Sequence, residues 1–115
     1  MKQLIFLLAA SILMAVSAHG QGQALNMTKL GQLSYNKSIN DVWGWTDTAN
    51  GKEYALVGVT DGVSVVDVTV PSNPQQVLFV PGASSVWRDL KTYGHYAYII
   101  HDRYRGASSG IEIID

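Results

Sequence analysis

The chain has 115 residues and no cysteine, so neither disulfides nor a zinc site built on cysteine can support its fold. Only 15% of the residues are charged, and the formal net charge is −1. No basic cluster is present, which argues against nucleic acid and anionic membrane surfaces as partners. The G-x-S-x-G, P-loop and H-E-x-x-H motifs are also absent, so no local motif indicates a reaction.

Helical periodicity is missing as well. Beyond the N-terminal region, no window of about eleven residues places apolar side chains at the spacing of an amphipathic helix. Instead, short runs of β-branched and aromatic residues alternate with Gly, Pro, Asn and Asp. This pattern predicts an all-β fold, in which strand packing alone must supply the core. Alternating apolar residues predict the first strand within residues 25–35.

The first 18 residues have the composition of a secretory signal peptide. Lys2 precedes an apolar run, residues 4–16, and small residues follow at the end of the segment. We predict cleavage between Ala18 and His19, a flexible leader at residues 19–24, and export to the cell surface or medium, with the periplasm as an alternative. An uncleaved membrane anchor is the other interpretation, although the run is shorter than the roughly 20 residues of a membrane-spanning helix. No membrane span is expected in the mature chain.

A hairpin is the strongest local signal. In E-Y-A-L-V-G-V-T-D-G-V-S-V-V-D-V, we expect Tyr54–Thr60 and Val63–Val68 to form two strands joined by an Asp61-Gly62 turn. A related hairpin closes the chain, with H-Y-A-Y-I-I from His95 and G-I-E-I-I-D from Gly110. The chain therefore contains an internal repeat.

The spacing of the repeat indicates its architecture. The offsets are 44, 42 and 48 residues, for Trp43 to Trp87, Tyr54 to Tyr96 and Asp67 to Asp115. A period near 40–50 residues with several strands in each unit is typical of a β-propeller blade. Residues 25–115 then supply about two blades of the four to eight that a closed propeller needs. We expect an incomplete propeller that self-associates through its exposed edges and faces.

The repeat resembles a known family. Y-A-L-V, then G-V-S-V-V-D-V-T from Gly62, then P-S-N-P from Pro71 is similar to an LVIVD repeat. Together with N-D-V-W-G-W from Asn40 and S-S-V-W-R-D from Ser84, it resembles the N-terminal part of the bacterial choice-of-anchor B proteins. The resemblance covers residues 25–115. It implies an exported protein with propeller-type repeats and a C-terminal anchoring segment, and it implies no enzymatic activity.

Two pairs of residues at corresponding repeat positions are predicted to be structural. Trp43 and Trp87 are expected to fill space within and between blades, although a sugar-stacking platform that includes Trp45 is the alternative. Asp67 and Asp115 are expected to accept backbone N–H groups in the turns that follow them. A cation such as calcium, bound by these two carboxylates, is the other interpretation of the pair, and no cofactor is otherwise expected.

The candidate binding site is an inserted loop. The tyrosine-to-glycine spacing is 8 residues in the first hairpin (54 to 62) and 14 in the second (96 to 110), so the second turn is six residues longer. Loops on a rigid β scaffold carry specificity. The predicted ligand-binding residues are His101, Asp102, Arg103, Tyr104 and Arg105. Arg88 and Asp89, in the second tryptophan segment, are expected to form an internal salt bridge, and a surface acid–base pair is the alternative.

These features predict an exported bacterial binding module for a protein or carbohydrate ligand. A hydrolase or lyase with His101 and Asp102 in a site on the loop face is one alternative, and a truncated, non-functional product is another. No residue is assigned a catalytic role, and no metal site is predicted.

Overall fold

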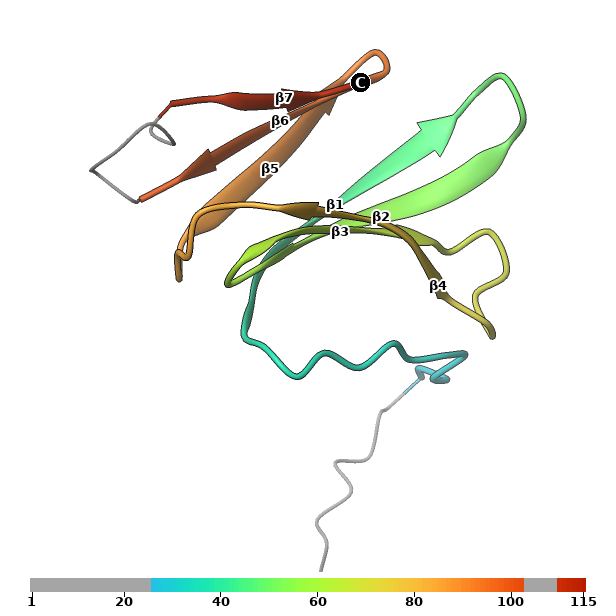
Figure 1. Ribbon diagram of the computed structural model, residues 1–115. Helices are drawn as coiled ribbons and strands as arrows, with labels where there is room; N and C mark the ends of the chain where they lie inside the picture. Colours follow the sequence, from blue (N-terminus) through green and yellow to red (C-terminus); the bar gives the residue numbers. More distant parts are fainter. Residues whose placement is uncertain (1–25, 103–109) are drawn as a thin grey trace, which may run out of the picture.

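A computed structural model of the chain describes residues 26–102 and 110–115. In this part the chain forms seven strands and no helix, which confirms the all-β prediction. The strands build two antiparallel sheets, ordered β1-β2-β3-β4 and β5-β6-β7, and these do not close into a ring (Figure 1). The bounds are β1 (Ile39–Asp47), β2 (Lys52–Val59), β3 (Gly62–Asp67), β4 (Gln75–Pro81), β5 (Arg88–Tyr93), β6 (Tyr96–His101) and β7 (Glu112–Ile114).

Both predicted hairpins are present, but the first turn lies one residue earlier than predicted. Val59 pairs with Gly62, so the two turn residues are Thr60 and Asp61. Neither of them has a positive φ. A side chain at Gly62 would place its Cβ 2.2 Å from the carbonyl oxygen of Val80. The glycine is therefore needed for the close approach of β4 and not for the reversal of the chain.

The segment predicted to contain the first strand, residues 26–35, forms no ladder and lies against one face of the β1–β4 sheet (Figure 1). We call it the N-terminal strap. Leu33 and Tyr35 pack on the cluster of Val57, Val59 and Val66. The Tyr35 hydroxyl lies 2.9 Å from Ser64 Oγ, whose side chain is buried. The strap covers a face that would otherwise expose apolar side chains to water.

Replacing Gly31 with alanine is expected to loosen the strap, because the new Cβ would lie 2.2 Å from the backbone oxygen of Pro71. Overpacking of this kind costs about 1–3 kcal/mol. Faster hydrogen exchange at the strap amides would measure the effect. Gly44→Ala is the matched control, since nothing lies within 4 Å of its added Cβ. Equal exchange in both variants would contradict the packing of the strap.

The two sheets enclose the main core. Leu56 and Val63 of the first sheet contact Leu90, Ala97 and Ile99 of the second, and all five side chains are buried. The other face of the first sheet carries the cluster under the strap. The first sheet is thus covered on both faces, by the second sheet and by the strap.

Hydrogen bonds join the sheets along their first strands. The indole Nε1 of Trp43 donates to Thr92 Oγ1 at 3.0 Å, and that of Trp45 donates to the carbonyl oxygen of Gly94 at 2.9 Å. The Trp43 ring also lies 4.2 Å below the Lys91 ammonium group. Trp43 therefore lies between the two sheets.

The strand register corrects the predicted alignment of the tryptophans. Trp43 pairs with Leu56 of β2. At the 42-residue offset between β2 and β6, Leu56 corresponds to Tyr98. Tyr98 pairs with Lys91, so the counterpart of Trp43 is Lys91 and not Trp87. The offset between the first strands is 48 residues, because eight residues separate the paired Trp45 and Tyr54, whereas two residues separate their counterparts Tyr93 and Tyr96. Trp87 precedes β5 and is 72% exposed.

Candidate functional site

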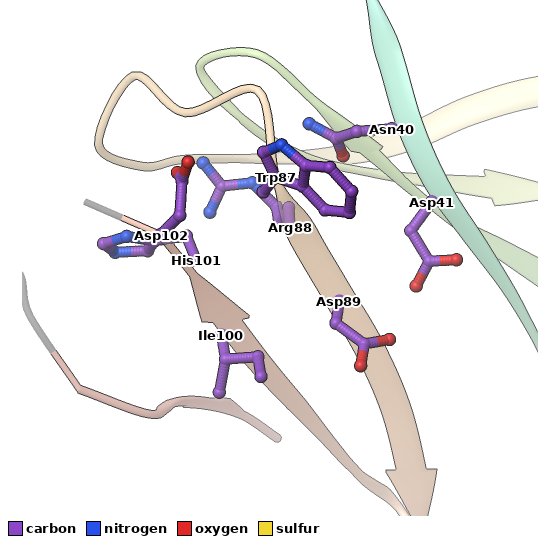
Figure 2. A pocket seen from close by; sticks show the side chains of 8 residues that line it. All are labelled: Asn40, Asp41, Trp87, Arg88, Asp89, Ile100, His101 and Asp102. Atoms are coloured by element: carbon purple, nitrogen blue, oxygen red, sulfur yellow. The ribbon is translucent and has the colours of Figure 1, made fainter.

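A cavity of about 450 Å³ opens where β1 and β5 begin and β6 ends. Its volume suits a small organic ligand. In the view of Figure 2, the Trp87 ring lies between the Asp41 and Asp89 carboxylates on one side and the His101 and Asp102 side chains on the other. The lining residues are Asn40, Asp41, Trp87, Arg88, Asp89, Ile100, His101 and Asp102.

Arg88 is the buried cation of this cavity, with 3% of its surface exposed. Its Nε donates to the carbonyl oxygen of Val59 at 3.4 Å, and its Nη2 donates to that of Ala83 at 2.7 Å. Its Nη1 has no hydrogen-bond partner in the described part of the chain. The predicted salt bridge to Asp89 is wrong, because successive strand residues point to opposite faces of the sheet.

Two carboxylates lie at equivalent positions of the first strands. Asp41 pairs with Gly58 and Asp89 with Ile100, at the common 48-residue offset. Asp41 Oδ2 accepts the backbone N–H of Leu90 at 2.8 Å, which ties the two sheets together. Asp89 accepts a hydrogen bond from the Lys91 ammonium group at 2.8 Å, and this contact holds the pKa of the Asp89 carboxyl below its usual value.

Ser85 braces the rim of the cavity. Its hydroxyl oxygen lies 2.6 Å from the carbonyl oxygen of Trp87, contacts an Asp102 carboxylate oxygen, and accepts the Trp87 N–H at 3.0 Å. The Asp102 N–H donates to the same Trp87 carbonyl at 3.3 Å. These contacts fix the backbone that carries Trp87 while its ring stays exposed to solvent.

The predicted binding loop reaches this cavity in part. His101 and Asp102 line it. Arg103, Tyr104 and Arg105 lie outside the described residues, as do the predicted signal peptide, the cleavage position between Ala18 and His19, and the leader at 19–24.

The aspartates predicted to be structural, Asp67 and Asp115, do not line the cavity. Asp67 accepts the backbone N–H of Thr69 at 3.0 Å within the turn after β3, and these contacts to Thr69 lower the pKa of its carboxyl. Asp115 is exposed, and its carboxylate lies 3.5 Å from Nε2 of His95. The register supports their correspondence, since Val66 and Ile114, which precede them, pair with Ala55 and Ala97.

Asn40, Asp41 and Ser85 were not predicted as site residues. Asn40 is the extra residue of a bulge, because Ile39 pairs with Val59 while Asp41 pairs with Gly58. The repeat holds the signal for Asp41, since N-D-V-W and R-D-L-K align on their aspartates at the 48-residue offset. No such signal exists for Ser85, whose role depends on its tertiary contacts.

The lining favours a polar, uncharged ligand. Three carboxylates and one guanidinium group face or border the cavity, so an anion would meet net negative charge. An exposed indole ring beside carboxylate oxygens offers a stacking surface with hydrogen-bond acceptors. No group of three or more potential metal-ligating side chains occurs within residues 26–102 and 110–115.

Comparison of the chain with protein-family models, with curated proteins and with solved structures finds no match. Residues 26–102 and 110–115 contain no helix of the length and hydropathy that a membrane span requires.

Proposed function

We propose that this chain is an exported bacterial interaction module, built from β-propeller repeats of the LVIVD type, that acts at the cell surface or in the medium. Its partner is a carbohydrate or a protein. The carbohydrate fits the cavity lining better, because the exposed Trp87 ring lies beside carboxylate groups that accept hydrogen bonds from hydroxyls.

The observation that supports this proposal is the repeated geometry of the two sheets. Within each pair of equivalent strands, residues at a fixed offset occupy the same place in the two sheets, as Asp41 of β1 and Asp89 of β5 do. The cavity lies at one end of these strands, beside the connection 82–87 and Asp102. In repeat proteins of this kind, a rigid stack of sheets presents loops of neighbouring repeats to a common partner.

Export is tested by the N-terminus of the protein. We expect material recovered outside the cytoplasm to begin at His19, or within two or three residues of it, because small residues precede this position. Edman sequencing or mass spectrometry of the N-terminal peptide measures this. Recovery of an intact Met1 from a membrane fraction would show that the segment anchors the protein.

Binding is tested with a carbohydrate array. We expect the purified chain to bind neutral glycans and Trp87→Ala to weaken that binding at least about tenfold, equivalent to about 1.4 kcal/mol. Tyr93→Ala is the matched control, because Tyr93 is also exposed but does not line the cavity. Equal glycan binding by Trp87→Ala and Tyr93→Ala would show that the cavity is not the glycan-binding site.

A hydrolase or lyase is the second candidate, favoured by one observation. His101 lines the same cavity as the carboxylates of Asp41, Asp89 and Asp102, and an imidazole beside carboxylates suits general acid–base catalysis. Bound glycans that are recovered chemically unchanged would favour the binding module. Cleavage that His101→Ala abolishes would favour the enzyme.

A further inference from the structure

Among residues 26–102 and 110–115, no segment covers one apolar face of the second sheet. Tyr98, Ile100 and Ile113 lie on the face that points away from the first sheet, and we call it the open face. Ile100 is 47% exposed and Ile113 is 58% exposed. Apolar side chains gathered on one face of a strand pair usually mark an interaction surface.

The register identifies what this face accepts. Tyr98 and Ile113 correspond to Leu56 and Val65 of the first sheet, on the face that packs on the second sheet. The open face of the second sheet is thus the counterpart of a face that is already covered by a sheet. Its equivalent position in the repeat favours the packing of another sheet of the same kind.

The surface that would dock there is also present in the chain. Ala97, Ile99 and Ile114 of the second sheet pack on the first sheet. Their counterparts in the first sheet are Ala55, Val57 and Val66, which lie under the N-terminal strap. The strap therefore occupies the place that a neighbouring sheet would take.

The strap covers that surface incompletely. A cavity of about 450 Å³ remains between it and the first sheet. Ile39 and Val42, at the border of this cavity, are 55% and 61% exposed. A sheet that packed there would cover more apolar surface than the strap does, and apolar burial favours the exchange.

Polar groups at the edge of the open face match the same arrangement. Within the chain, Asp41 of the first sheet accepts the backbone N–H of Leu90 of the second sheet. At the 48-residue offset, the counterpart of Asp41 is Asp89 and the counterpart of Leu90 is Val42. A second copy in the equivalent register would place the Val42 N–H at the Asp89 carboxylate. Asp89 is exposed, so its present contact with Lys91 is easily exchanged.

We propose that the open face binds a second copy of this chain head to tail, on the first sheet of that copy, after its N-terminal strap has moved aside. The contact joins two different surfaces and is therefore heterologous. Each copy keeps one unused surface, so further copies add until the assembly closes into a ring or extends as an open array. The inference rests on the repeat packing that supports the proposed function, but it does not depend on export or on a glycan ligand.

A mixed disulfide tests the register. An added Cβ at Gly58 would lie 3.4 Å from Cβ of Arg88. In the contact between two copies, strand pairing makes Ile100 of one copy the counterpart of Gly58 and Ile39 of the other copy the counterpart of Arg88. This spacing is near the roughly 3.5–4.5 Å between Cβ atoms in disulfides. The chain has no cysteine of its own, so single substitutions give unambiguous products.

We expect Ile39→Cys and Ile100→Cys, mixed at equal concentration under mild oxidation, to form a heterodimer at least about ten times faster than Thr48→Cys mixed with Ile100→Cys. Thr48 lies in the exposed β1–β2 loop. Ile100→Cys homodimers that form as fast as the heterodimer would overturn the proposal in favour of a symmetric contact between open faces. Absence of any preferred product would overturn it as well.

Two further variants shift the association in opposite directions. Light scattering should give a higher mean mass for Gly31→Ala, whose strap is loosened, and a monomer mass for Ile113→Lys, which places a charge on the open face. Unchanged masses in both would overturn the proposal. Ile113 does not line the glycan cavity, so Ile113→Lys that is monomeric yet binds the array separates this inference from the proposed function.

Discussion

Replacing Ile99 with alanine is expected to lower the free energy of unfolding by about 2–5 kcal/mol. The Ile99 side chain has no exposed surface and lies in the core between the sheets, against Leu56 and Leu90. Its truncation removes apolar burial and leaves a cavity that the two sheets cannot close without moving. Because the stability of a small domain is about 5–15 kcal/mol, this loss is a large share of the total.

The neighbouring residue provides the control. Ile100 has the same side chain, but it lies on the opposite face of β6 and is 47% exposed. Ile100→Ala should change the free energy of unfolding by less than about 1 kcal/mol. Urea unfolding of both variants at low protein concentration measures the difference. Equal losses would mean that β6 has the other register, with its opposite face in the core.

Replacing Trp43 with alanine is expected to cost about 3 kcal/mol, the lower end of the range for a buried tryptophan, because the ring is half buried. The substitution removes the hydrogen bond to Thr92, the contact with Lys91 and the packing on the core between the sheets. Trp43→Phe keeps most of the packing and should lose only about 1 kcal/mol, the usual worth of a hydrogen bond.

Trp87→Ala is the comparison for this prediction, since it removes an equally large ring that is 72% exposed. It should change the free energy of unfolding by less than about 1 kcal/mol. Thermal unfolding followed by circular dichroism measures all three variants. If Trp87→Ala destabilises the chain as much as Trp43→Ala does, the two rings share one structural role, and the register-based distinction between them is wrong.

The hairpins were predictable because their signals are local. Runs of β-branched residues separated by Gly and Asp specify strands and a reversal without reference to the rest of the chain. The sequence did not reveal which of two adjacent isoleucines faces the core, since Ile99 and Ile100 are both apolar. Only the contacts between sheets decide this, and they leave Ile100 on the open face.

The tryptophan alignment failed for a related reason. The V-W dipeptides at Trp43 and Trp87 match locally at an offset of 44 residues, but strand pairing sets the offset between β1 and β5 at 48. Eight residues lie between the paired residues Trp45 and Tyr54, but only two lie between their counterparts Tyr93 and Tyr96, and a dipeptide carries no information about this difference of six. The bulge at Asn40 shifts the alignment at this end of the strand by one more residue.

The candidate site was predictable only where it belongs to a loop. The inserted turn pointed to His101 and Asp102, and both line the cavity. The side chains of Asp41 and Arg88 reach the same cavity from the beginnings of two strands, where sequence alone suggests a strand residue and an ion pair. The strap was missed because its position depends on contacts distant in sequence, such as that of Tyr35 with Ser64.

The packing of equivalent sheets is the central claim, and the indole N–H groups test it most directly. The chain has three tryptophans, so an ¹⁵N-labelled sample of Ile113→Lys should give three resolved indole signals. We predict slow exchange for Trp43 and Trp45, with nuclear Overhauser contacts from their Nε1–H to Thr92 and Gly94, and fast exchange for Trp87. Fast exchange at all three indoles, without contacts between the sheets, would contradict the account.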